Sequence, residues 1–314
     1  MAENKKFKKR ILLVGMPDMA LVCMTKLALE GVNIVACVPP NKDHNTYRLF
    51  CDYADNLDLP VINYENSLKD DDFLEKLKAL DLDLAVVCSY GKLFPKEFLN
   101  VTKDGFVNVH PSLLPKYRGA NPYPHVIINN EKETGVTLHY MDGHFDTGDI
   151  IAQQKVEIFK NDTMGTLFNR LNFLGADMLA EMLKDYEKNG RPKGTKQPEG
   201  DFVKAPAINQ ATPDTFINWK QPAEDIERFT RALNPFINAV AFYRGNALKI
   251  HMGYVENYDS GFAPGTIVST DFDLAVATKK GTFHITILQA GSYFVGAASD
   301  FIRLSHCKIG ELME

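Results

Sequence analysis

The chain has few cysteines, and none of them stands in a pairing or metal-binding arrangement. Its 314 residues contain no CxxC motif. Most cysteines lie in apolar stretches such as AVVCSY, which is typical of buried thiols. The sequence therefore argues against a disulfide scaffold, a zinc finger and a redox motif. The five residues are Cys23, Cys37, Cys51, Cys88 and Cys307.

Long hydrophobic runs are also missing. The N-terminal segment MAENKKFKKR precedes a short apolar run, ILLVG, but MPDM breaks that run at once, unlike the apolar region of a signal peptide. No stretch approaches the roughly 20 apolar residues that a membrane helix needs. We expect a cytoplasmic protein without a membrane partner.

An excess of charge of one sign is absent as well. The formal net charge is −5, with 45% hydrophobic and 24% charged residues. This composition excludes collagenous and disordered classes, and it argues against strong nonspecific binding to nucleic acid. The length leaves room for two domains.

Several familiar active-site motifs do not occur. The turn after the first apolar run reads GMPDMA instead of GxGxxG, and the second run ends in CVPP without an acidic residue, which argues against NAD binding. HExxH, EF-hand and GxSxG patterns are missing too. The sequence therefore favours neither a metalloprotease nor a serine nucleophile.

What the sequence does contain is an alternation of apolar runs and helical patterns. Strands are predicted at ILLVG, NIVACVP, PVINY, LDLAVVCSY and GFVNVHPS, with helices near residues 19–30, 47–56 and 71–79. A short helix near 122–130, strands at TGVTLHYM and DIIAQQKVEI, and a long helix ending near residue 188 follow. The alternation predicts an open, mostly parallel α/β sheet.

The segment GRPKGTKQPEGDFVKAP, residues 190–206, is rich in turn residues and poor in apolar ones. We interpret it as a linker between a catalytic domain at 1–189 and a second domain at 207–314. The second domain has one helical pattern, PAEDIERFTRALN, among short strand-like runs. This pattern predicts a small β-rich, OB-like domain.

Polar side chains gather where two of the predicted strands end. Asn108 and His110 are two residues apart in NVHPSLLP and so share one face of a strand, and Asp146 in DGHFDTGD could reach the imidazole from a neighbouring strand. A carboxylate that orients a histidine beside an amide suits stabilisation of charge on a carbonyl oxygen. The alternatives are a structural histidine with two turn residues, or a metal site that adds His139 and His144.

Two long blocks carry a resemblance to a known family. FVNVHPSLLPKYRGANP followed by ETGVTLHYMDGHFDTGDIIAQ resembles the signature of folate-dependent formyltransferases, which include methionyl-tRNA formyltransferase and glycinamide ribonucleotide transformylase. AVVCSYGKLFP is similar to their folate-pocket strand and loop. INWKQPAEDIERFTRALNPF and APGTIV resemble the C-terminal domain of the methionyl-tRNA enzymes, a domain that the transformylase lacks.

This resemblance implies a Rossmann-like catalytic domain and 10-formyltetrahydrofolate as co-substrate, with no metal. It implies that Asn108, His110 and Asp146 are catalytic, and that SLLP ends regular structure so that backbone groups can meet the folate ring. The residues implied for the folate pocket are Ser89, Tyr90, Gly91, Lys92, Leu93, Leu114, Pro115, Asp142 and Gly143. Those implied for the acceptor are Ser112, Tyr117 and Arg118.

The resemblance leaves open which amine receives the formyl group. Methionyl-tRNA enzymes carry a longer basic, glycine-containing loop after the second strand, whereas CVPPNKDHNTYRLF is short and contains only Lys42, His44 and Arg48 as basic residues. Residues 207–314 contain nine Lys or Arg against eleven Asp or Glu. We expect a nucleotide-linked amino sugar as acceptor, with initiator methionyl-tRNA as the alternative. A formyl hydrolase and a folate-binding module without catalysis are further alternatives.

Overall fold

The computed structural model describes residues 7–210 and 212–314 and divides into two compact units. The first unit contains the described residues up to Pro122, together with Glu133–Glu157 and Asn169–Ala205. The second contains Tyr123–Lys132, Ile158–Phe168 and the described part of Pro206–Glu314. The units thus interleave along the sequence, and the domain limits at residues 189 and 206 stay predictions.

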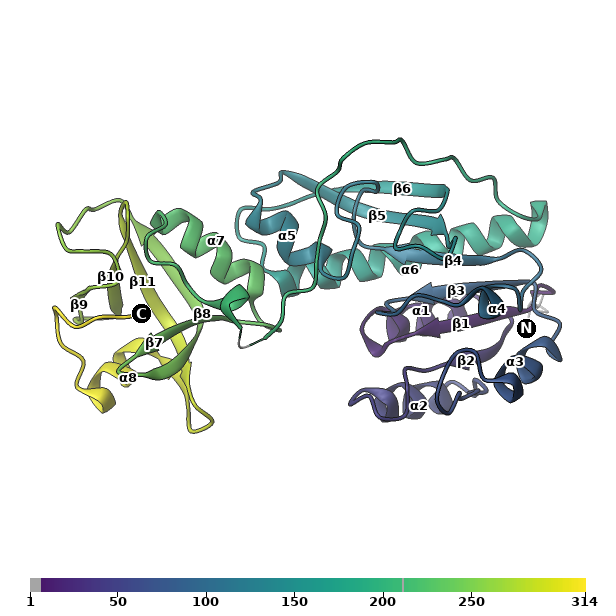
Figure 1. Cartoon of the computed structure of the whole chain (residues 1–314), viewed down its shortest axis with the longest axis horizontal. Coiled ribbons are helices and arrows are strands. Elements are labelled where there is room, and N and C mark those ends of the chain that lie inside the picture. Colours follow the sequence, from purple (N-terminus) through teal and green to yellow (C-terminus); the bar gives the residue numbers. More distant parts are fainter. Residues whose placement is uncertain (1–6, 211) are drawn as a thin grey trace. The chain divides into compact units, whose positions relative to one another are not determined.

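A six-stranded sheet forms the centre of the first unit (Figure 1). The pairings of β1, β2, β3 and β4 are parallel, whereas β5 pairs antiparallel with β4 and with β6. The prediction of a mostly parallel sheet is confirmed. In spatial order the strands are β2 (Ile34–Val38), β1 (Ile11–Gly15), β3 (Leu84–Cys88), β4 (Phe106–His110), β5 (Glu133–Tyr140) and β6 (Ile150–Glu157).

Helices pack on both faces of this sheet. On one face, α1 (Pro17–Leu29) and α6 (Met164–Asn189) are joined by an ion pair between Lys26 and Asp177 at 2.8 Å. On the other face, α3 (Asp71–Lys78) and α4 (Lys96–Leu99) bury aromatic and aliphatic side chains against β1, β3 and β4. Since β1 and β3 are covered on both faces, they read as continuous apolar runs. Helix α2 (Tyr47–Asn56) also belongs to the first unit, whereas α5 (Pro122–Ile128) lies almost entirely in the second.

Two kinds of element differ from the sequence prediction. The strand predicted at PVINY was wrong, because only Val61 forms an isolated bridge, to Cys37. Pro60 has no N–H to donate, which limits the ladder there. The elements α4, η1 (Pro213–Thr215) and β12 (Phe294–Ala297) were not predicted, because so few residues carry no clear period. Helix α8 (Ala298–Ser305) was not predicted either.

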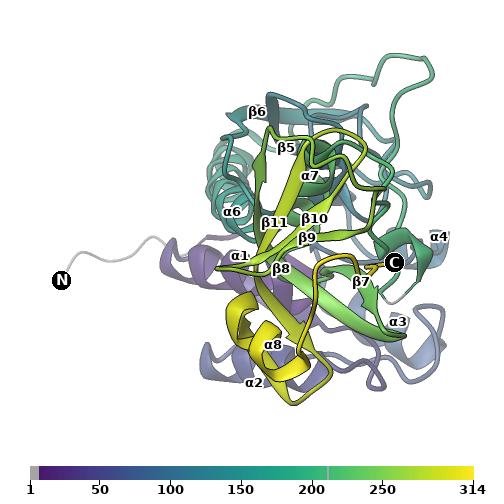
Figure 2. The ribbon, with the colours of Figure 1, turned by 90° about the vertical axis from the view of Figure 1, so that its left-hand side faces the viewer.

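The second unit contains an antiparallel sheet in the order β7, β8, β11, β10, β9, with β12 paired to β11. Helix α7 (Ala223–Leu233) packs on β8 and β11 (Figure 2), and α8 packs on β11 and β12. The prediction of a small β-rich second domain is confirmed. The strands are β7 (Ala239–Tyr243), β8 (Asn246–Glu256), β9 (Ile267–Ser269), β10 (Leu274–Ala277), β11 (Thr282–Ala290) and β12.

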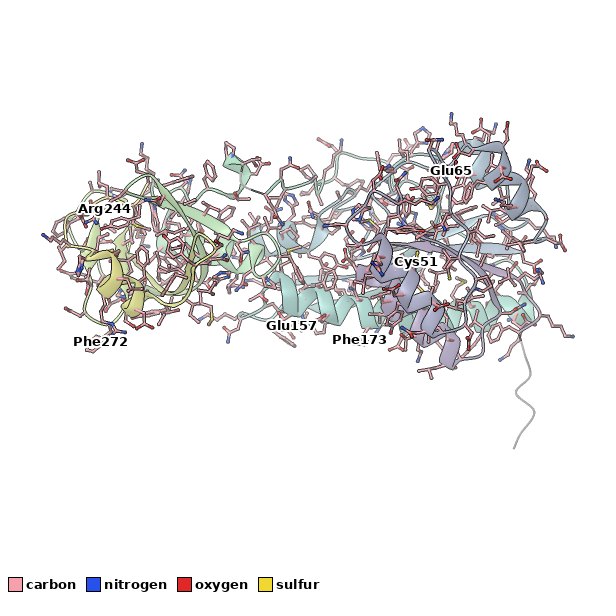
Figure 3. All side chains as sticks on the ribbon, turned by 90° about the horizontal axis from the view of Figure 1, so that it is seen from below. Cys51, Glu65, Glu157, Phe173, Arg244 and Phe272 are labelled. Carbon is pink, nitrogen blue, oxygen red and sulfur yellow. The ribbon has the colours of Figure 1, made fainter. Side chains whose placement is uncertain are left out.

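The cysteines behave as the sequence suggests. All five are free thiols, and four are buried. Cys51 on α2, labelled in Figure 3, is only partly buried. Within residues 7–210 and 212–314, no helix is long and apolar enough to cross a membrane.

Candidate functional site

The end of β4 positions the first two candidate side chains. Phe106, Asn108 and His110 alternate along the strand and therefore share a face of the sheet. Phe106 packs into the core cluster beneath α3 and α4. The strand ends at His110, which is only 4% exposed, and the chain then turns away. The strand thus delivers an amide and an imidazole to its carboxyl end, where ligands of open α/β sheets bind.

Asp146 reaches this pair from the turn between β5 and β6. Its Oδ1 lies 3.6 Å from Nδ1 of His110 and 3.4 Å from Nδ2 of Asn108. Its Oδ2 accepts a hydrogen bond from the backbone N–H of Gly119 at 2.9 Å. The structure therefore brings together Asn108, His110 and Asp146, the three residues that the sequence predicted to form a site.

The hydrogen bonds of His110 define its tautomer. Nε2 lies 2.9 Å from the carbonyl oxygen of Tyr117, and a carbonyl can only accept, so Nε2 carries the proton. Nδ1, which faces Asp146, is then the nitrogen that can take up a further proton. A carboxylate beside that nitrogen stabilises the charged ring.

The two ionisable groups shift in ways that suit this arrangement. Burial lowers the pKa of His110 and Asp146 raises it, with a net pKa below the ordinary 6.5. Burial raises the pKa of Asp146, but His110, His139 and the Gly119 N–H lower it more strongly, so this pKa lies well below its usual range. Near neutral pH the site holds a carboxylate beside a neutral imidazole.

His139 joins the site as a cross-strand neighbour that the sequence suggested only as a metal ligand. It pairs with Asn108 in the register of β4 and β5. Its Nδ1 donates to the carbonyl oxygen of Tyr140 at 2.8 Å, which leaves Nε2 to accept from Nδ2 of Asn108 at 3.1 Å. Only the strand register, which the sequence did not show, reveals this role.

The turn SLLP does not present its backbone as expected. The N–H of Leu114 donates to Oγ1 of Thr137 at 3.2 Å, and its carbonyl accepts from Gln153 at 2.7 Å. Ser112 is fully buried and donates to the carbonyl of Lys116 at 2.8 Å. Buried polar groups need partners, and side chains of β5 and β6 supply them for the backbone of Leu114. Pro115, which follows Leu114, is partly exposed.

A pocket of about 420 Å³ lies beside the predicted folate residues. Lys92, Leu93 and Gly143 line it. The sequence analysis did not identify the lining residues between positions 64 and 69, because no motif or periodicity in that segment indicates a binding site. The other lining residues are Tyr64, Asn66, Ser67, Leu68, Lys69, Phe94 and Pro95.

Four other predicted folate residues, Ser89, Tyr90, Gly91 and Asp142, are not among the residues that line this pocket. Tyr90 packs against the core, and its hydroxyl lies 2.7 Å from that of Tyr64. Ser89 adopts a positive φ of 58°, and Gly91 is exposed with open space around it. Asp142 accepts from Thr147 at 2.8 Å and so closes the turn that contains Asp146. A larger cavity of about 530 Å³ lies between β6 and α6 and contains none of the candidate residues.

The predicted acceptor residues follow on the same loop. Tyr117 is buried with a positive φ of 62°, and Arg118 is partly exposed. Arg118 donates from Nε and Nη2 to Oε1 of Gln197, at 3.2 and 2.6 Å. Gln197 lies in the segment interpreted as a linker, so the sequence gave no signal for it.

The described residues contain no group of three or more His, Cys, Asp or Glu side chains arranged to hold a metal ion. His144 is an exposed turn residue whose ring lies 3.8 Å from Asp142. The site is therefore built from one amide, two imidazoles and one carboxylate.

A mostly parallel α/β unit with this site at a strand end, followed by a β-rich unit, defines a class of group-transfer enzymes with two domains. Residues 11–183 match the formyl transferase family, and residues 211–305 match the formyl transferase C-terminal domain. The chain belongs to the formyl transferase family. The expected family and the expectation of a formyltransferase enzyme are confirmed.

Known proteins of two kinds resemble the chain over most of its length. The methionyl-tRNA formyltransferase of Caldanaerobacter subterraneus subsp. tengcongensis is 35% identical over 294 residues, 91% of this chain and 94% of that protein. The N-formyltransferase of Helicobacter canadensis, solved with folinic acid and dTDP-3-aminofucose, has a TM-score of 0.67 at 22% identity and covers 90% of this chain and 100% of its own.

A sugar 3N-formyl transferase solved with dTDP and 5-N-formyl-THF has a TM-score of 0.65 at 21% identity, covering 91% of this chain and 99% of its own. At such identities these two structures support the fold alone. The first relative supports the family.

Proposed function

We propose that the chain transfers the formyl group of 10-formyltetrahydrofolate to a primary amine by direct attack, without a covalent enzyme intermediate. The observation that carries this proposal is the meeting of Asn108, His110 and Asp146 at the end of β4. A carboxylate that lies 3.4 Å from an amide nitrogen and 3.6 Å from an imidazole nitrogen suits the stabilisation of charge that develops on a formyl oxygen.

The pocket lined by Lys92, Leu93 and Gly143 has the size and lining of a folate site. Its volume of about 420 Å³ falls in the usual range for small-molecule sites, about 300–1,000 Å³. Leu68, Leu93 and Phe94 offer apolar walls to a heterocycle, and Lys69 and Lys92 offer positive charge to the carboxylates of its glutamate tail. Two proteins of similar fold were solved with folate derivatives, folinic acid and 5-N-formyl-THF, which supports a folate as the co-substrate.

Each catalytic residue has a role in this reaction. The hydrogen bond from Nδ2 of Asn108 to Asp146 is long, at 3.4 Å. The amide hydrogen in this bond can therefore turn toward the formyl oxygen. His110 can take a proton at Nδ1, where the charge is stabilised by Asp146. The amine nitrogen bonds to the formyl carbon, the bond from that carbon to N10 of the folate breaks, and the amine proton ends on N10.

The acceptor we infer is an amino group on a nucleotide-linked sugar. Residues 39–46, which join β2 to α2, are closed by local turn bonds such as the one from Asp43 N to Asn41 Oδ1 at 3.0 Å. Lys42 is the one Lys or Arg within them. A protein that grips a tRNA acceptor stem needs several cations against its phosphates. A short loop with one lysine better suits a small acceptor.

The charges of the C-terminal residues and of Arg118 also support a nucleotide-linked amino sugar as the acceptor. Residues 207–314 carry slightly more acidic than basic side chains. Arg118 directly follows Tyr117, whose carbonyl oxygen lies 2.9 Å from Nε2 of His110, so its planar guanidinium can meet a diphosphate near the reacting centre.

Initiator methionyl-tRNA is the second candidate acceptor. The observation that favours it is the identity of 35% with a methionyl-tRNA formyltransferase across 91% of the chain. This candidate requires that cations from parts of the chain other than residues 39–46 contact the tRNA.

An assay of formyl transfer from 10-formyltetrahydrofolate, followed as tetrahydrofolate release, distinguishes the candidate acceptors. One reaction contains initiator methionyl-tRNA, and the others contain UDP- and dTDP-linked amino sugars. We expect turnover with a sugar nucleotide and little with the tRNA. Efficient turnover of the tRNA would reject the sugar assignment, formate release without any acceptor would identify a hydrolase, and folate binding without turnover would leave a binding module.

A further inference from the structure

Gln197 is a buried polar residue in a stretch that otherwise faces solvent. It is 5% exposed, whereas Lys196 and Pro198 on either side are exposed. Its side-chain Nε2 donates to the carbonyl oxygens of Asp146 and Gly148, at 2.9 and 2.8 Å. Its Oε1 accepts both bonds from Arg118. The two amide hydrogens and both oxygen lone pairs of Gln197 are therefore used.

The backbone around Gln197 is fixed at both ends. Thr195 exchanges two hydrogen bonds of 2.8 Å with Ile150 at the start of β6. Val203 accepts from the N–H of Tyr117 at 2.6 Å, and the N–H of Ala205 donates to the carbonyl of Arg118 at 2.8 Å. Residues 195–205 thus form a strap across the loop that contains Arg118 and the turn that contains Asp146.

The contacts of Gln197 close a ring of hydrogen bonds between that loop and that turn. Arg118 bonds to Gln197, Gln197 bonds to the backbone of Asp146, and the carboxylate of Asp146 accepts from the N–H of Gly119, the residue after Arg118. Asp146 sits at a φ of 56°, a region that residues other than glycine occupy at a cost, so surrounding bonds must hold it there.

We propose that Gln197 is a positioning residue that orients two groups at once: the carboxylate of Asp146, through its backbone, and the guanidinium of Arg118. The strap, which lies in the first unit, is then part of the active site. This inference rests on the proposed function, in which Asp146 serves the chemistry and Arg118 the acceptor.

The two halves of the Gln197 amide can be tested separately. Gln197→Glu keeps an acceptor for Arg118 but removes both donors to the carbonyls of Asp146 and Gly148, so we expect kcat to fall about 10-fold or more with little change in the KM of the acceptor. Arg118→Met keeps the donors, so we expect the KM of the acceptor to rise with kcat nearly retained. Gln197→Met removes both functions, so both constants should change.

A structural readout separates this inference from the proposed function. Hydrogen exchange of residues 117–121 and 142–149 is measured in the wild-type chain and in Gln197→Met, with Gln210→Met as the matched control. Gln210 is exposed and donates to one carbonyl, that of Phe236, at 2.8 Å. We expect faster exchange in both segments for Gln197→Met only.

The outcomes are distinct. If the wild type formylates no amine but exchange rises in Gln197→Met, the proposed function fails and the positioning role stands. If exchange in both segments matches wild type, the positioning role is overturned whatever the acceptor is. If all three substitutions lower only the amount of folded enzyme, with kcat and KM per folded molecule unchanged, Gln197 is structural and the inference is also overturned.

Discussion

Asn108 and His139 face each other across β4 and β5, with 3.1 Å between Nδ2 of the amide and Nε2 of the ring. In the neutral ring, Nδ1 of His139 donates to the carbonyl oxygen of Tyr140 and Nε2 accepts, and this tautomer determines which end of the Asn108 amide points toward His139. The register of the two strands thus sets the orientation of a group proposed to act on the formyl oxygen.

Replacing His139 should therefore affect the chemical step. His139→Met keeps a side chain of similar length without the acceptor, and we expect kcat to fall about 10-fold to 100-fold because Asn108 is free to turn. His139→Gln, which offers an amide oxygen as acceptor, should recover part of the loss. Steady-state kinetics with the folate KM as internal control is the measurement. Equal kcat for Met and Gln variants would contradict the orienting role.

His110→Ala should abolish most formyl transfer while folate binding stays near normal. The imidazole is proposed to take a proton during the reaction, and loss of such a group typically costs about 10²-fold to 10⁴-fold in rate. Tetrahydrofolate release reports turnover, and calorimetry with a folate analogue reports binding. His306→Asn is the matched control, since His306 is exposed at a left-handed position that asparagine tolerates. Survival of transfer in His110→Ala would rule out the proposed mechanism.

The protonation of His110 should occur at a lower pH than that of an ordinary histidine. Burial lowers the pKa of this ring, so its titration midpoint should lie below 6.5, and the ring should stay neutral through the pH range above it. The Asp146 carboxylate raises the same pKa, and Asp146→Asn should therefore move the midpoint lower still. NMR titration of the His110 ring in both proteins is the test. A midpoint that rises in Asp146→Asn would mean that the carboxylate does not act on this imidazole.

Gly119→Ala should destabilise the first unit. Gly119 has a φ of 123°, and a Cβ there would lie 2.4 Å from the carbonyl oxygen of Ala205. Strained backbone of this kind costs about 1–3 kcal/mol, and the collision would also push the strap away. The free energy of unfolding from urea titration is the measurement. Gly91→Ala is the control, because that position has open space and no positive φ, and an equal loss in both variants would refute the strap contact.

The sequence predicted a good part of the candidate site because some of its geometry is local. Asn108 and His110 are two positions apart on one strand, and the alternation of a strand places them on one face whatever else the chain does. The buried runs of β1 and β3 likewise predict a parallel sheet covered on both faces. The strand predicted at PVINY is reduced to one bridge between Val61 and Cys37, because Pro60 has no N–H with which to extend the ladder.

Other parts of the site could not be read from the sequence. Tyr90 stands in a motif similar to a folate pocket, yet its ring packs into the core and its hydroxyl meets Tyr64. Leu114 follows the catalytic strand, yet its backbone groups are taken by Thr137 and Gln153. Which polar groups face a ligand depends on which neighbours satisfy the rest, and that is a property of packing.

By itself, the sequence determined the α/β order of the first unit, the β-rich second one, and the face that Asn108 and His110 share, because period and spacing are properties of consecutive residues. The family followed from the resemblance of two long sequence blocks to known formyltransferases. Only the tertiary structure decided that His139 orients Asn108 and that Gln197 joins Arg118 to the Asp146 turn. Those contacts join residues 31, 79 and 51 positions apart, and strand register and chain crossings, which no local pattern encodes, bring them within hydrogen-bonding distance.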